Sequence, residues 1–265
     1  MTAKVIAHSS SKGKPDLITV ELEYPRFIHG ELMTHRVFSR NASSSRAIPI
    51  RKMIAKVWKN PAKPTYWGTN KSGMQAGKEL KGLRLLLAKS LWTVACAVAC
   101  TLSYALHLCG LHKQHANRLT EPFQYINVLV TATEWDNFFK LRSHSSAQPE
   151  IKELSDAINL AISNSTPKVL NESQWHLPYI LDEDIRATNS NYDLLCKISS
   201  ARCARLSYMT HGNKEIDRDK DFRLFNQLAG SDPMHLSPTE HQATPSDRGN
   251  ANFKGWKQFR YNLGG

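Results

Sequence analysis

Hydroxyl and guanidinium groups are concentrated between residues 34 and 49, in the stretch THRVFSRNASSSRAIP. It holds four serines together with Arg36, Arg40 and Arg46. A guanidinium group can bind two phosphate oxygens at once, and serine hydroxyls add short hydrogen bonds. The stretch therefore favours binding of a phosphorylated small molecule, while composition alone also allows a solvated loop.

Two further arginines lie in polar segments beside apolar runs. Arg118 occurs in HANRLTEP and Arg142 in NFFKLRSHSSAQPEI. Both could bind an anion, although surface ion pairing is the usual role of an arginine. The chain contains no GxGxxG, GxxxxGK[ST] or GxSxG motif, so nothing supports a dinucleotide-binding Rossmann domain, a P-loop or a hydrolase elbow.

The histidines do not follow the ligand spacing of a zinc site, and we predict no bound metal. The groups considered are His107, His112 and His115, then His235 and His241.

The charge balance favours anionic partners. Lys and Arg number 35 against 23 Asp and Glu, a formal charge of +12. Nucleotides, nucleic acid, phosphorylated cofactors and acidic lipids could all bind such a surface. The same charge is also compatible with a soluble basic surface that binds no partner. The five cysteines form no CxxC pair and no apolar leader opens the chain, so we expect reduced thiols and a cytoplasmic location.

Hydropathy patterns predict the elements that must position these groups. Residues 16–27 alternate as a strand does, and 148–163 place apolar residues on one helical face. Further helices are expected in 28–38, 133–142, 191–208 and 220–229, with an irregular connection over 57–75. These patterns predict an α/β (α+β) fold, a helix-rich single domain with a central antiparallel or mixed sheet.

A long helix is expected from about residue 79 to 108, ending at Gly110. Its apolar part is long enough to span a membrane. Small and polar residues dilute it, so we predict a buried central helix, at a subunit interface or within the core, and no membrane. The diluting residues are Ser90, Thr93, Thr101, Ser103 and His107.

Several motifs together resemble the flavin-dependent thymidylate synthases. THRVFSRNASSSR is similar to the family signature, and the ELEYPRFIHGEL before it is similar to the strand and helix that precede that signature. Downstream, CGLHKQHANRLTEP and NFFKLRSHSSAQPEI resemble two later family segments. The signature positions matched here are His35, Arg36, Ser39, Asn41, Ser44 and Arg46.

The segments that open the family sequence resemble the C-terminal part of this chain. ARCARLSY and HLSPTEH are similar to them. This order implies a circular permutation, which domains tolerate because their termini often lie close together. A single domain would then span 1–265: the signature and central helices in 1–163, a joining linker in 164–191, and the equivalent of the family N-terminus in 192–265.

The resemblance implies a homotetramer that converts dUMP to dTMP with FAD, methylenetetrahydrofolate and NADPH. Ser44 and Arg46 would hold the pyrimidine deoxynucleotide, with Arg46 and Arg118 on its phosphate. Arg142 would lie against the pyrimidine ring and, with Ser44, form the catalytic pair. The flavin positions carried over are His35, Arg36, Asn137, Ser207, His235, Ser237 and Glu240.

Three departures from the family pattern leave alternatives open. Thr34 replaces an arginine of the signature, Ala42 an acidic residue, and Ser146 a histidine. Arg260 or Trp256 of the C-terminal tail could compensate. A flavin-dependent hydroxymethylase acting on dUMP or dCMP would also fit, as would a non-catalytic nucleic-acid-binding protein on the same scaffold.

Overall fold

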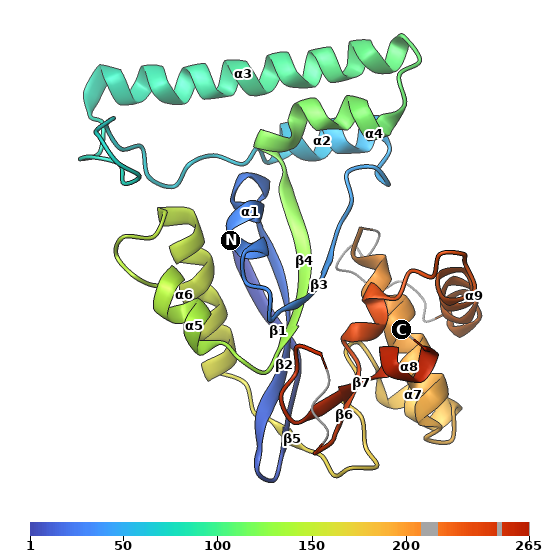
Figure 1. Cartoon of the computed structure of the whole chain (residues 1–265). Helices are drawn as coiled ribbons and strands as arrows, with labels where there is room; N and C mark the ends of the chain where they lie inside the picture. Colours follow the sequence, from blue (N-terminus) through green and yellow to red (C-terminus); the bar gives the residue numbers. More distant parts are fainter. Residues whose placement is uncertain (208–216, 248–250, 265) are drawn as a thin grey trace.

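The computed structural model describes residues 1–207, 217–247 and 251–264. A five-stranded sheet lies at its centre, in the order β3-β4-β2-β1-β5 (Figure 1). Neighbouring strands are antiparallel except β5, which is parallel to β1, and helices surround the sheet. The predicted helix-rich fold with a mixed sheet is confirmed. The strands are β1 (Thr2–Ser11), β2 (Lys14–Pro25), β3 (Ser39–Ala42), β4 (Tyr125–Ala132) and β5 (Lys168–Val169).

Helices α5 (Asp136–Arg142) and α6 (Pro149–Ser163) cover one face of the sheet (Figure 1). Alternation along β2 sends Val20 and Leu22 toward these helices. The predicted apolar face of α6 is confirmed, because Ile151, Leu154 and Ile158 are fully buried against the sheet.

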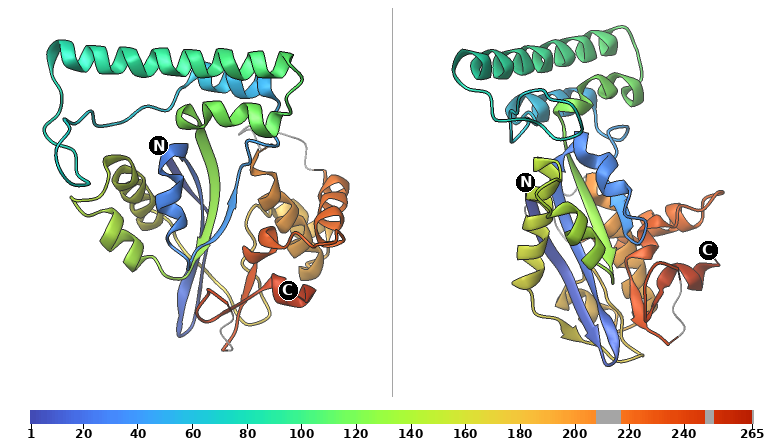
Figure 2. Two further views of the ribbon diagram at one scale, coloured as in Figure 1. Left: turned by 45° about the horizontal axis from the view of Figure 1, so that its top comes forward. Right: turned by 60° about the vertical axis from the view of Figure 1, so that its left-hand side comes forward.

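The C-terminal segment covers the opposite face (Figure 2). A buried network of hydrogen-bonded side chains connects the C-terminal segment to three strands. His176 bonds Ser9 of β1 and Thr19 of β2, each at 2.8 Å. Thr19 bonds Thr131 of β4 at 2.7 Å, and Thr131 bonds His241 at 2.8 Å. The segment contains α7 (Asp182–Ala187), α8 (Tyr192–Ala204), η3 (Arg205–Ser207), α9 (Arg218–Ala229), η4 (Ser237–Glu240), β6 (Ala243–Pro245), β7 (Trp256–Gln258) and η5 (Phe259–Leu263).

A helical layer lies across one end of the sheet (Figure 1). Its longest member, α3 (Gly82–Leu108), ends as predicted, since Gly110 follows it with φ of +83°. The prediction that this helix is buried is wrong for the single chain. Only Cys96, Cys100 and Ser103 are buried, because the helix is apolar all round but packs on one side only. The other members are α2 (Ile50–Lys59), α4 (Lys113–Ala116) and η2 (Asn117–Phe123), and η1 (Arg26–Ile28) with α1 (His29–Met33) lies below them.

Candidate functional site

Arg142, the last residue of α5, is fixed against the end of α1. Its Nε donates to His35 Nε2 at 3.0 Å. Its Nη2 donates to Thr34 Oγ1 at 2.9 Å and to the Glu31 carbonyl at 3.2 Å. Within the described residues, Nη1 has no protein partner, so two of the five guanidinium N–H groups stay available to a ligand.

His35 is held as a neutral base beside this guanidinium. Its Nε2 accepts from Arg142, so the ring proton lies on Nδ1. Burial, and then the charges of Arg142 and Arg40, lower the pKa of His35 below its ordinary value. The ring is fixed by Phe38 and Phe138, whose centroids lie 5.7 and 4.9 Å away. We call Thr34, His35 and Arg142 the Arg142 cluster.

A second cluster forms around Glu121 of η2. Ser45 donates its hydroxyl to Glu121 Oε1 at 3.0 Å, and Arg118 Nη1 donates to both carboxylate oxygens, at 3.0 and 3.2 Å. Arg26 forms a further ion pair with it at 3.0 Å. Arg46 is exposed and directly follows Ser45 of this cluster in the chain. Glu121 is not among the residues predicted from the sequence, although its position three residues after Arg118 is a signal for such an ion pair.

The Arg142 cluster and the Glu121 cluster share no residue, but one segment connects them. Arg26, which pairs with Glu121, begins η1, and α1 follows it directly and ends next to Thr34 and His35. Arg142 reaches this segment from α5 through its bonds to Thr34 and His35.

The C-terminal segment packs directly on the signature strand β3. Asn41 Nδ2 donates to the Cys203 carbonyl at 3.1 Å, and Gln258 Nε2 donates to Ser39 Oγ at 3.0 Å. Motifs from the two ends of the sequence are thus neighbours in the fold.

The predicted flavin residues lie mostly around this junction. Glu240 of η4 pairs with Arg260, while Trp256 is fully buried in the core and donates its Nε1 to the Pro15 carbonyl. Ser207 ends η3, and its side chain lies outside the described residues. The exposed members are Arg36, His235 and Ser237 near β3 and η4, and Asn137 in the first turn of α5.

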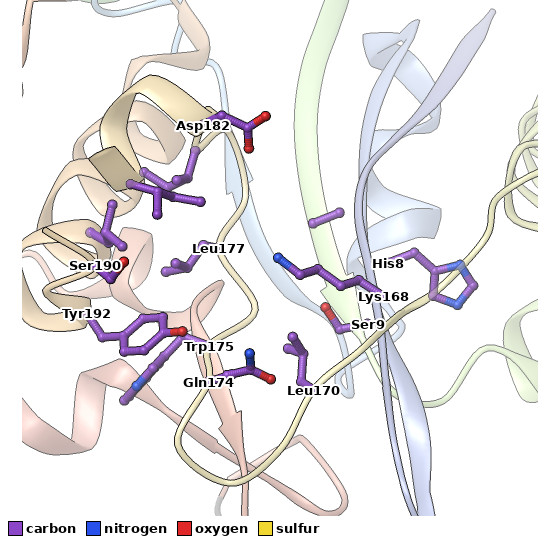
Figure 3. A pocket seen from close by; sticks show the side chains of 14 residues that line it. His8, Ser9, Lys168, Leu170, Gln174, Trp175, Leu177, Asp182, Ser190 and Tyr192 are labelled. Atoms are coloured by element: carbon purple, nitrogen blue, oxygen red, sulfur yellow. The ribbon is translucent and has the colours of Figure 1, made fainter. Parts of the chain in front are cut away.

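A separate cavity of about 300 Å³ lies between β1, β5 and α7–α8. Figure 3 shows Lys168 extending into it toward Leu177, with Trp175 and Tyr192 along one wall and His8 facing away. None of the predicted site residues lines this cavity.

More than half of the chain, residues 16–168, matches the family model described as thymidylate synthase complementing protein. The chain belongs to this family, the flavin-dependent thymidylate synthases. The match includes the signature, Arg118 and Arg142. The C-terminal motifs lie beyond the matched range, so the circular permutation stays a prediction.

Two solved structures share the fold. Both are of the UMP/dUMP methylase PolB from Streptomyces cacaoi, one with 5-Br dUMP and one with 5-Br UMP bound. Each is 17% identical to this chain with a TM-score of 0.50, covering 61% of this chain and 89% or 88% of the PolB chain. A search of curated protein sequences gives no match.

Proposed function

We propose that the protein transfers the methylene carbon of methylenetetrahydrofolate to C5 of dUMP. In the balanced reaction, dUMP, methylenetetrahydrofolate, NADPH and a proton give dTMP, tetrahydrofolate and NADP⁺. Family membership and the methylase neighbours support C5 methylation of a pyrimidine nucleotide. The observation that carries the proposal is the fixed guanidinium of Arg142, with its Nη1 donors unoccupied by the described residues.

Each of the two clusters would bind a different part of dUMP. A fixed cation beside the pyrimidine ring stabilises negative charge that develops there during the reaction, and this is the role proposed for Arg142. Arg46 and Arg118 suit the phosphate, because a guanidinium can bind two of its oxygens. Ser44, in the same loop, is proposed as a further nucleotide contact.

The residues around β3 fit FAD by their donor chemistry. Arg36 is exposed and forms no ion pair within the described residues, so it can meet a pyrophosphate. Ser237 offers a hydroxyl at the start of η4. His241 directly follows Glu240 in the chain, and its buried Nε2 has no hydrogen-bond partner among the described residues. Bound FAD would supply the redox chemistry, and the protein would bind and orient the nucleotide.

Product analysis tests the reaction directly. Purified protein is incubated with FAD, NADPH, methylenetetrahydrofolate and either dUMP or dCMP, and the nucleotide is analysed by mass spectrometry. A gain of CH₂ on dUMP supports the proposal. A gain of CH₂O on either nucleotide would replace it with hydroxymethylation, as the departures at Thr34, Ala42 and Ser146 allow. Absence of both product and bound flavin would favour the nucleic-acid-binding alternative, whose affinity should fall steeply with salt.

Arg46→Ala is expected to weaken dUMP binding about tenfold, the scale of one lost hydrogen bond between charged groups. FAD affinity should stay within about twofold, because Arg46 directly follows Ser45 of the Glu121 cluster and is proposed to bind the phosphate of dUMP. Calorimetric titration with each ligand measures both. Arg186→Ala, at an exposed arginine of α7, is the matched control. Equal losses of both affinities would contradict the placement of Arg46.

We propose that a second copy of the chain covers α3 in a homotetramer. By length and composition α3 could cross a membrane, and only 11% of its most apolar window is buried. A helix that is apolar all round requires a cover. The exposed stripe consists of Leu87, Leu91, Val94, Val98 and Leu102.

Leu91→Glu combined with Val98→Glu is expected to reduce the assembly to monomers or dimers. Each substitution places a charge in the centre of the covered stripe, where burial would be costly. Light scattering after size exclusion measures the mass. Leu160→Glu, at an equally exposed leucine of α6, should leave the assembly intact. A wild-type monomer that floats with lipid vesicles would overturn the proposal in favour of a membrane.

A further inference from the structure

We propose that Thr34 is a positioning residue for Arg142. Thr34 stands where the family signature has an arginine, and its hydroxyl lies in the Arg142 cluster. The inference rests on the proposed function, because the proposed function makes the pyrimidine ring of dUMP the ligand of Arg142. It turns a departure from the signature into part of the site.

The hydroxyl of Thr34 is fixed in direction by two hydrogen bonds. It donates to the Glu31 carbonyl at 2.7 Å and accepts from Arg142 Nη2 at 2.9 Å. Its single proton is used in the first bond, so its oxygen faces the guanidinium as an acceptor. An arginine at this position has no acceptor for the Nη2 proton of Arg142.

Thr34 thereby determines which edge of the guanidinium reaches a ligand. His35 occupies the Nε donor, while Thr34 and the Glu31 carbonyl occupy the two Nη2 donors. The Nη1 donors point elsewhere and find no partner in the described part of the chain. Each of these two N–H groups can donate to a carbonyl oxygen of a pyrimidine ring. Without the Thr34 acceptor, one Nη2 proton loses its partner, and two hydrogen bonds instead of three hold the guanidinium in this direction.

Thr34→Val removes the acceptor with little change in side-chain volume. We expect kcat for dUMP to fall about tenfold, the scale of one hydrogen bond to a charged group, with KM changed less than about threefold. Thr34→Ser should restore at least half of the wild-type kcat. In an Arg142→Ala background Thr34→Val should have no further effect, since the two residues act as one unit. Additive losses, or failure of serine to rescue, would overturn the proposal.

Crystal structures of the wild type, Thr34→Val and Thr34→Ser separate this inference from the proposed function. Arg142 should keep its contacts with His35 in the wild type and the serine variant, and should be displaced in the valine variant. An unmoved Arg142 in Thr34→Val overturns the positioning role, whatever the substrate is. A wild type with no activity on any pyrimidine nucleotide, but with Arg142 displaced in Thr34→Val, rejects the proposed function and retains the positioning role.

Discussion

Acidification from pH 7 to pH 5 is expected to lower the free energy of unfolding by about 4 kcal/mol. The cause is the buried chain of hydrogen bonds that contains His176 and His241. Both imidazoles are almost or fully inaccessible, at 1% and 0% exposure. Burial lowers the pKa of each to about 3, and for His176 the neighbouring His241 and His8 act in the same direction.

The direction of this effect follows from where protons bind. In the unfolded chain both histidines titrate near their ordinary pKa of about 6.5, whereas in the folded chain they stay neutral down to about pH 3. Below pH 6.5 the unfolded chain therefore binds more protons, and stability falls as pH falls. Each histidine accounts for about 2 kcal/mol between pH 7 and pH 5. Above pH 7 this contribution to the pH dependence disappears.

Urea unfolding at a series of pH values measures the effect. His176→Gln combined with His241→Gln should lower stability at pH 7, because an amide fits the hydrogen-bond chain less well, and should flatten the slope between pH 7 and pH 5. His144→Gln, at an exposed histidine, is the control. A slope that is unchanged in the double variant would show that other groups cause acid unfolding.

Periodicity predicted the elements whose two faces differ. The side chains of β2 point alternately to the sheet face covered by α5 and α6 and to the face with the buried hydrogen-bond network. Helix α6 carries one apolar stripe. Strand β4 was missed because YINVLVTA is buried nearly throughout, and a short continuous apolar run does not distinguish strand from helix. Helix α2 was missed because prolines that follow it made the whole region resemble a loop. Strand β1 pairs along nearly its full length with β2, but its own sequence is only weakly apolar.

Sequence motifs predict which residues belong to the candidate site but not how they are arranged. His35, Arg46, Arg118 and Arg142 could be proposed because each lies in a recognisable local segment. The contact between Thr34 and Arg142 joins residues 108 positions apart and exists only because α5 returns to α1. The same holds for the hydrogen bond between Thr131 and His241, 110 positions apart. Local sequence carries no information on such tertiary contacts.

Arg142→Ala is expected to reduce kcat for dUMP by about 10² to 10³, the loss typical when one fixed donor to a developing negative charge is removed. The reason is geometric as well as electrostatic. His35, Thr34 and the Glu31 carbonyl hold the guanidinium by one edge, so its position is set before a nucleotide binds. A group arranged in advance stabilises the transition state without reorganising during the reaction. Steady-state kinetics with dUMP measures the change.

Arg142→Lys should recover little of this activity. An ammonium group is a single point of charge and lacks the planar fork that bonds His35 and Thr34 while leaving two N–H groups for the ligand. Lys140→Ala, at an exposed cation on the same helix, should keep the wild-type kcat and so controls for charge loss on α5. Unfolding midpoints should be similar for all three variants, because Arg142 is not in the buried core. If lysine at position 142 restored full activity, charge alone would suffice, and the hydrogen bonds that Thr34 and His35 make to the guanidinium would have no catalytic consequence.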